Sequence, residues 1–265
     1  MDRVYARAAT KTSERQLGAM NSTHEGEQTP SGFAFVGTAT IGMGALMVLV
    51  LDVVTAWRDP DYLRQTISEY GLGSQQWVFS AGVVLLAVGS VSILRAIILQ
   101  RMATLSSVAA RALVLWTIGL IAVVAVPKQD WSNDPTIGVG GAVHRIGAIV
   151  AFLSLPIAIF ATSWPWFRDP QWRFWSRLTG SLGLLSAMFL VPIFYALVVG
   201  LTTTTPWYRA VTVGYVERGL VVAEVVALIS LGLWVCAVER RARHQDGLAS
   251  GTASFKGDCP TLDTR

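Results

Sequence analysis

The sequence predicts an all-α polytopic membrane protein, folded as a bundle of six transmembrane helices. First, the 265 residues are 52% hydrophobic and only 14% charged, whereas soluble domains carry about 25% charged residues. Second, only seven of the 21 basic and 17 acidic residues lie within six long apolar runs. Third, each run is near or above the roughly 20 residues that a helix needs to cross a bilayer. Backbone amides must be paired in lipid, and the alternation of a β-barrel is missing, so the runs are predicted to be helices.

The predicted helices follow one another through short polar connections. The first is preceded by 32 polar residues and is too long for the apolar core of a signal peptide, so we expect it to be retained. The segments 1–32 and 239–265 are rich in Ser, Thr, Gly and charge, which predicts two disordered tails around a transmembrane domain at 33–238. The predicted spans are 33–54, 77–99, 109–127, 139–162, 178–200 and 212–238.

Basic residues are divided unequally between the two ends of the predicted bundle. The tails and the connections after the second and fourth helices hold 13 Lys and Arg, and the other three connections hold four. The positive-inside rule therefore predicts a cell-membrane protein with both termini in the cytoplasm. The stretch 163–177 alternates Trp and Arg, and we interpret it as an anchoring loop, with a specific lipid-headgroup site as the alternative.

The composition excludes a soluble enzyme, a secreted disulfide scaffold and a nucleic-acid-binding module. Cys236 and Cys259 fall on the predicted cytoplasmic side without a CxxC spacing, so we expect no disulfide. His144 is the single histidine within a predicted span, which rules out a bis-histidine haem, and no metal or other cofactor is expected. A metal site formed by His144 and carboxylates stays open as an alternative.

Charged residues within the spans are the main functional clue, because each costs about 2.5–3.5 kcal/mol at mid-bilayer. Two arginines near the predicted cytoplasmic ends can extend to the headgroups. The others gather with one histidine at one level near the outer leaflet, and Glu224 lies two turns deeper. Arg218 is expected to pair across helices with Asp52 or Glu69, and a network that only fixes helix packing explains the set equally well. The set is Asp52, His144, Arg145, Glu217, Arg218 and Glu224.

The predicted outer connections add polar residues at the same level. Ser68 and Glu69 follow the first span, and Asp130 follows the third. A serine, a carboxylate and His144 in one neighbourhood are the elements of a nucleophile system, but no strained turn of the GxSxG type presents Ser68. We therefore assign no catalytic residue and leave enzymatic activity open, although we favour a non-enzymatic role.

Four short motifs stand at the predicted outer ends of the helices: TISEYGLG from Thr66, PKQD from Pro127, HRIGA from His144 and ERGL from Glu217. With them the chain resembles, over about residues 33–238, the prokaryotic six-helix membrane proteins grouped as domain of unknown function 998 (DUF998). It is also distantly similar to the eukaryotic Frag1/DRAM/Sfk1 membrane family, some of whose members are linked to lipid and GPI-anchor handling. The resemblance implies a six-helix fold without a settled activity. Its favoured positions are Ser68, Glu69, Gly71, Asp130, His144 and Arg218.

We expect a multi-pass membrane protein that binds a lipid headgroup or a small amphiphile at this outer-leaflet polar centre. His144, Arg145 and Arg218 are the expected anion-facing groups. Glu69 or Asp130 is expected to orient the histidine. Membrane lipids are the expected partners, and nucleic acid is not.

Two other functions stay open. In the first, the protein is an accessory or scaffold protein, whose charges only lock the helices together and which recruits membrane-protein partners or forms a homo-oligomer. In the second, it is a proton-linked transporter that uses His144, Glu217 and Glu224 as a relay.

Overall fold

In the part of the chain that it describes, a computed structural model contains helices joined by turns and no strand, which confirms the predicted fold class. Six of the helices are long and apolar enough to cross a membrane. The described residues are 32–59, 62, 65–126, 128, 138–202 and 211–255. The long helices are α2 (Phe33–Arg58), α3 (Gln76–Leu99), α4 (Val108–Ala125), α5 (Val139–Ser163), α6 (Arg173–Thr202) and α8 (Val213–Phe255), and two short 3-10 helices, η2 (Ile67–Leu72) and η3 (Trp164–Trp166), lie in the connections.

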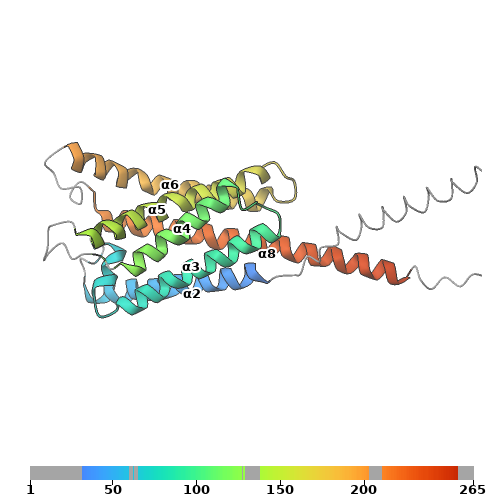
Figure 1. Ribbon diagram of the computed structural model, residues 1–265, viewed down its shortest axis with the longest axis horizontal. Helices are drawn as coiled ribbons and strands as arrows, with labels where there is room; N and C mark the ends of the chain where they lie inside the picture. The colour runs from blue at the N-terminus through green and yellow to red at the C-terminus, as the bar shows by residue number, and fades with distance from the viewer. Residues whose placement is uncertain are drawn as a thin grey trace, which may run out of the picture. The chain divides into compact units, whose positions relative to one another are not determined.

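The long helices form one bundle in which each packs against its neighbours in sequence (Figure 1). α2 and α8 also pack together, so the first and last helices close the bundle into a ring. α8 additionally contacts α3 and α5, which places it toward the middle of the bundle. One end of the bundle carries η2, and we call it the η2 end. The opposite end carries η3 and the continuation of α8.

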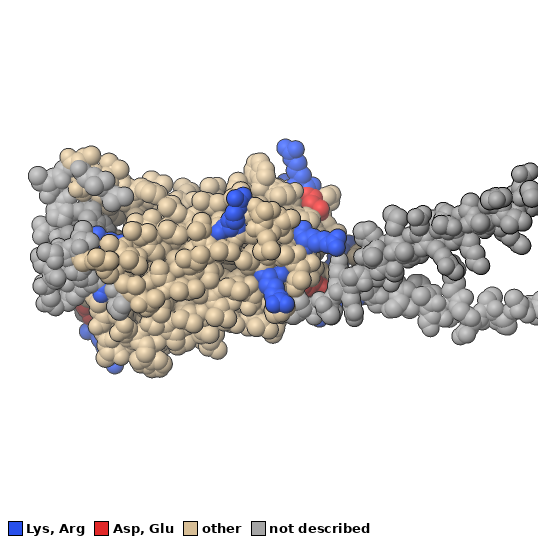
Figure 2. Space-filling model, viewed as in Figure 1, with Lys and Arg blue, Asp and Glu red and all other residues tan. Residues whose placement is uncertain are grey.

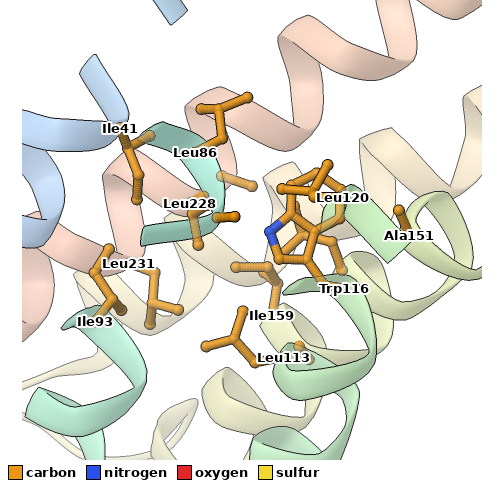
Figure 3. Close-up of a cluster of buried hydrophobic side chains, with 14 of the residues drawn as sticks. Ile41, Leu86, Ile93, Leu113, Trp116, Leu120, Ala151, Ile159, Leu228 and Leu231 are labelled. Atoms are coloured by element: carbon orange, nitrogen blue, oxygen red, sulfur yellow. The ribbon is translucent and has the colours of Figure 1, made fainter. Parts of the chain in front are cut away.

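Buried side chains from five helices meet in the interior (Figure 3). The indole nitrogen of Trp116 donates to the hydroxyl of Ser90 at 3.0 Å, so this deep tryptophan has its polar atom satisfied. In lipid, helix association gains little from the hydrophobic effect and relies on close van der Waals packing. The side chains labelled in Figure 3 are Ile41, Leu86, Ile93, Leu113, Trp116, Leu120, Ala151, Ile159, Leu228 and Leu231.

Glycines permit two pairs of helices to approach each other closely. A Cβ placed on Gly44 of α2 would stand 2.5 Å from the carbonyl oxygen of Gly82 in α3. A Cβ placed on Gly119 of α4 would stand 2.6 Å from the carbonyl oxygen of Gly147 in α5. Both distances are shorter than a carbon–oxygen contact allows. The backbones of α2 and α3, and of α4 and α5, therefore meet directly, as small residues permit in membrane bundles.

Three helices extend at least four residues beyond their predicted spans, and the first of them, α2, ends at Arg58 rather than at 54. α6 begins at Arg173 rather than at 178, because the Trp and Arg side chains of an interface segment are compatible with a helix. α8 continues to Phe255 rather than ending at 238, so residues 239–255 are helical where the sequence indicated a disordered tail. Charged residues at the bilayer edge end an apolar run, but they do not end a helix. Glu239 and Arg243, one turn apart on α8, lie 3.9 Å from each other and form an ion pair that is compatible with the helix. The N-terminal tail lies outside the described residues, and the cytoplasmic placement of both termini stays a prediction.

We expect Gly44→Ala to lower the free energy of unfolding by about 1–3 kcal/mol, because the new methyl group meets the backbone of α3, which cannot turn aside as a side chain does. Gly42→Ala is the matched control, since nothing lies within 4 Å of a Cβ at that position in the same helix. The control is expected to be neutral or slightly stabilising, because alanine favours helix over glycine by up to about 1 kcal/mol. Thermal unfolding of both variants in one detergent is the measurement, and equal midpoints would contradict the close approach.

Candidate functional site at the η2 end

The connection between α2 and α3 folds over the bundle as η2, and its sequence explains where that helix begins. Thr66 precedes η2, and its backbone N–H donates to Glu69 Oε1 at 3.3 Å. The Thr66 side chain in turn caps the backbone N–H of Glu69, which completes a T-x-x-E capping box. This cap sets the rotation of η2, so that Ile67 and Tyr70 face inward and are buried.

Arg218, near the start of α8, holds this connection against the bundle. A guanidinium has five N–H bonds, and five acceptors surround this one, so its donors are all used within the protein. Only 11% of the side chain is exposed. The guanidinium carbon also lies 4.9 Å from the centre of the Tyr62 ring. The acceptors are Asp52 Oδ1 at 2.9 Å, the carbonyl oxygens of Gln65 at 2.7 Å, Gly214 at 3.1 Å and Tyr62 at 3.3 Å, and the Tyr70 hydroxyl oxygen at 3.3 Å.

Tyr70 closes a triangle with the ion pair. Its hydroxyl donates to Asp52 Oδ1 at 2.7 Å while its oxygen accepts from Arg218. Burial raises the pKa of the Tyr70 phenol above its ordinary value, and the hydrogen bond to Asp52 raises that pKa further, so the phenol remains a donor at neutral pH. The triangle joins α2, η2 and α8. Of the two partners predicted for Arg218, Asp52 is therefore confirmed.

Glu217 makes a second attachment between α8 and η2. Its Oε2 atom accepts a hydrogen bond from the backbone N–H of Ile67 at 3.2 Å, and the residue is buried. Adjacent residues on a helix point about 100° apart. Glu217 and Arg218 nevertheless both bind the connection, because η2 and the residues before it wrap around the end of α8.

Lys128 lies just beyond α4 and makes a third attachment to the connection. Its Nζ atom donates to Thr66 Oγ1 at 2.6 Å and to Glu69 Oε1 at 3.2 Å. The Lys128 side chain is 17% exposed, and that of Glu69 is 37% exposed. An ammonium group has three donors, and the described residues supply acceptors for two of those of Lys128.

His144 has one ring nitrogen paired and the other unpaired. Nδ1 lies 2.9 Å from the carbonyl oxygen of Val126, and because a carbonyl can only accept, Nδ1 carries the proton. The neutral ring then has its lone pair at Nε2. This nitrogen is buried, and no hydrogen-bond partner lies near it in the described part of the chain.

Of the two carboxylates expected to orient the histidine, Glu69 binds Lys128 and its own cap, and Asp130 lies outside the described residues. The partner that the structure gives the ring is the Val126 carbonyl. The hydroxyl of Ser68 lies 3.1 Å from that of Thr66 and has no hydrogen bond to the histidine. Backbone carbonyls have no sequence signature, so this partner of the ring was not predictable.

Two of the remaining predicted residues, Arg145 and Glu224, belong to the spanning helices α5 and α8. Arg145 follows His144 on α5 and is half-buried, and Asp130 lies outside the described residues. Glu224 is fully buried two turns along α8 from Glu217, and neither of its oxygens has a hydrogen-bond partner among the described residues. The residues that the structure describes contain no group of three His, Cys, Asp or Glu that could hold a metal ion.

Sequence reasoning missed Thr66, Tyr70 and Lys128 as parts of the site, although it singled out the segments that contain them. The spacing of Thr66 and Glu69 is a capping-box signature and was the available signal for η2. Nothing in the sequence indicates that Tyr70 reaches both Asp52 and Arg218, because that contact depends on how the connection folds back over α8.

A family model described as "Protein of unknown function (DUF998)" matches residues 40–234, which is most of the chain. The comparison with curated proteins and the comparison with solved structures gave no match.

We expect Arg218→Lys to lower the free energy of unfolding by about 2 kcal/mol, because one ammonium group cannot satisfy five acceptors arranged around a planar fork. The loss is below the 3–5 kcal/mol seen when a fully buried pair is broken, since this ion pair is partly exposed. Arg111→Lys is the control, because Arg111 is exposed at the opposite end. Thermal unfolding in detergent measures both variants, and an Arg218→Lys midpoint equal to that of the control would refute the role given to the guanidinium.

Proposed function

The chain belongs to the DUF998 family, and we propose that within this family it is a cell-membrane protein that binds a lipid headgroup or small amphiphile at the η2 end. The observation that carries the proposal is the buried Nε2 atom of His144, which has no hydrogen-bond partner among the described residues. Unpaired buried polar atoms are rare in folded proteins and call for a partner.

The protonation of His144 narrows the chemistry of this ligand. Because Nδ1 donates to the Val126 carbonyl, the neutral ring offers an acceptor at Nε2 and suits a hydroxyl group of the ligand. Among the described residues, Lys128 has one donor left after its bonds to Thr66 and Glu69, and it suits a phosphate oxygen. A phosphate group next to a hydroxyl group, as in a phosphoglycerol headgroup, satisfies both residues.

Arg218 has no part in this proposal, although the sequence suggested it as an anion-facing group. Its five donors are occupied by acceptors of the protein, so binding an anion there would break existing bonds. The same closed network supports the alternative function, an accessory or scaffold protein whose charges only hold helices together. The transporter alternative gains no support, because Glu224 is 0% exposed and has no hydrogen bond to Glu217 or His144 in the described part of the chain.

Native mass spectrometry of the full chain, purified in mixed micelles, tests the binding proposal. Wild type is expected to retain phosphatidylglycerol, which has hydroxyl groups on its headgroup, in preference to phosphatidylcholine, which has none. His144→Ala and Lys128→Gln are each expected to weaken the binding of the lipid at the η2 end about tenfold, the loss that follows from one hydrogen bond to a charged or buried group.

Arg111→Gln is the matched control, because it removes one positive charge from an exposed position at the opposite end. It is expected to leave phosphatidylglycerol retention at the η2 end unchanged. If His144→Ala and Lys128→Gln retain lipid as wild type does while unfolding at a lower temperature, the binding proposal is wrong and the scaffold function is favoured.

A further inference from the structure

The connection between α5 and α6, residues 164–172, is fastened to α8 at the end opposite η2. Asp169 Oδ1 accepts hydrogen bonds from the backbone N–H groups of Gln171 at 2.8 Å and Trp172 at 3.1 Å, which turns the chain into α6. The side-chain oxygen of Gln171, in the orientation that its neighbours require, accepts from Trp172 Nε1 and from Arg241 Nε, each at 3.0 Å. Since Arg241 belongs to α8, the connection has a defined position on the bundle.

Three hydrogen-bond donors are buried beneath this connection without an acceptor in the described part of the chain: Ser163 Oγ, Trp166 Nε1 and Trp234 Nε1. The two indole rings meet edge to face, with centroids 6.3 Å apart, and Ser163 lies about one turn before Trp166. Buried donors in native proteins nearly always have a partner. An indole N–H can only donate, so the partner that completes this group is an acceptor.

The charges around these donors favour an acceptor with negative charge. Asp169 already binds two backbone N–H groups, and Glu239 is buried beside Arg243. Figure 2 shows Lys and Arg side chains toward the end from which α8 leaves the bundle. Guanidinium groups bind phosphate oxygens through paired hydrogen bonds. Exposed arginines of the connection and of the two helices beside it form what we call the arginine rim: Arg168, Arg173, Arg177, Arg240, Arg241 and Arg243.

Exposed aromatic side chains next to the arginine rim indicate a lipid rather than a free anion. Trp164 is 63% exposed and Phe174 is 68% exposed, at the ends of two apolar helices. Tryptophan is typical of the level at which lipid headgroups meet the acyl chains. A lipid whose phosphate lies at the arginine rim would place its chains along α5 and α6, whereas inorganic phosphate would use none of this surface.

We propose that Ser163, Trp166, Trp234 and the arginine rim bind the phosphate group of an anionic phospholipid, at a site separate from the one at the η2 end. The phosphate oxygens accept hydrogen bonds from the two indole N–H groups and the serine hydroxyl, and the arginines balance the charge. The indole nitrogens are sealed in this structure. Entry of the headgroup therefore requires the Trp166 ring, which is the less buried of the two, to turn aside.

The test counts phosphatidylglycerol and phosphatidylcholine bound to the full chain by native mass spectrometry in mixed micelles. Trp166→Phe and Trp234→Phe keep an aromatic ring and remove an N–H group, and each is expected to weaken phosphatidylglycerol retention about tenfold. Trp116→Phe is the matched control, because its Nε1 atom is already bonded to Ser90, and it is expected to change lipid retention little. Millimolar inorganic phosphate is expected not to displace the lipid.

Equal retention of the two lipids by wild type, or wild-type retention in both Trp→Phe variants, would overturn the proposal and assign the three donors to internal water. Displacement by inorganic phosphate would overturn the choice of a lipid. If Trp234→Phe does not fold, lipid retention by the Trp166→Phe variant alone tests the proposal, because Trp166 is only half-buried. Because native mass spectra count bound lipids, the two sites are distinguishable. His144→Ala and Lys128→Gln are expected to lose only the lipid at the η2 end, and Trp166→Phe and Trp234→Phe only the lipid bound here.

Discussion

A charged side chain placed near lipid has to find its partners inside the protein, and Arg218 meets this requirement through five acceptors. They come from α2, from the connection after it and from α8 itself. Because the guanidinium is planar and its donors are fixed in direction, the acceptors must stand in one arrangement. That arrangement determines where the first connection lies on the bundle, and the other polar contacts of the η2 end depend on it.

The network divides the polar residues of the η2 end into two groups. Asp52, Tyr70, Glu217 and Arg218 bind one another or the backbone of the connection, and their chemistry is used for packing. Among the described residues, Lys128 keeps one donor and His144 one acceptor without a partner. Residues that the sequence placed at one depth in the membrane therefore fall into two groups, one that holds the helices together and one that we propose binds a ligand. Ligand chemistry, where we propose it, lies between α4 and α5 rather than at Arg218.

Much of the fold was predictable from the sequence, because a helix that crosses a bilayer needs about 20 apolar residues and hydropathy alone locates such runs. Five of the six spans begin within one residue of the observed helices. The length of α8 was not predictable in this way, since residues beyond 238 continue the helix in a polar setting. At the site, opposite charge indicated Asp52 as a partner of Arg218. Hydropathy does not describe the paths of the connections between helices. The hydrogen bonds made by the Val126 carbonyl, the Ile67 amide and the Tyr70 hydroxyl depend on those paths and were therefore not predictable.

Hydrogen–deuterium exchange of Arg218→Ala in detergent tests the central claim most directly, because it reports the stability of the first connection residue by residue. If Arg218 holds that connection in place, the amides of residues 65–72 will exchange about tenfold faster or more, while those in the middle of α3 and α4 keep the protection of wild type. Unchanged exchange across residues 65–72, or a loss of protection spread evenly over all the helices, would contradict the account.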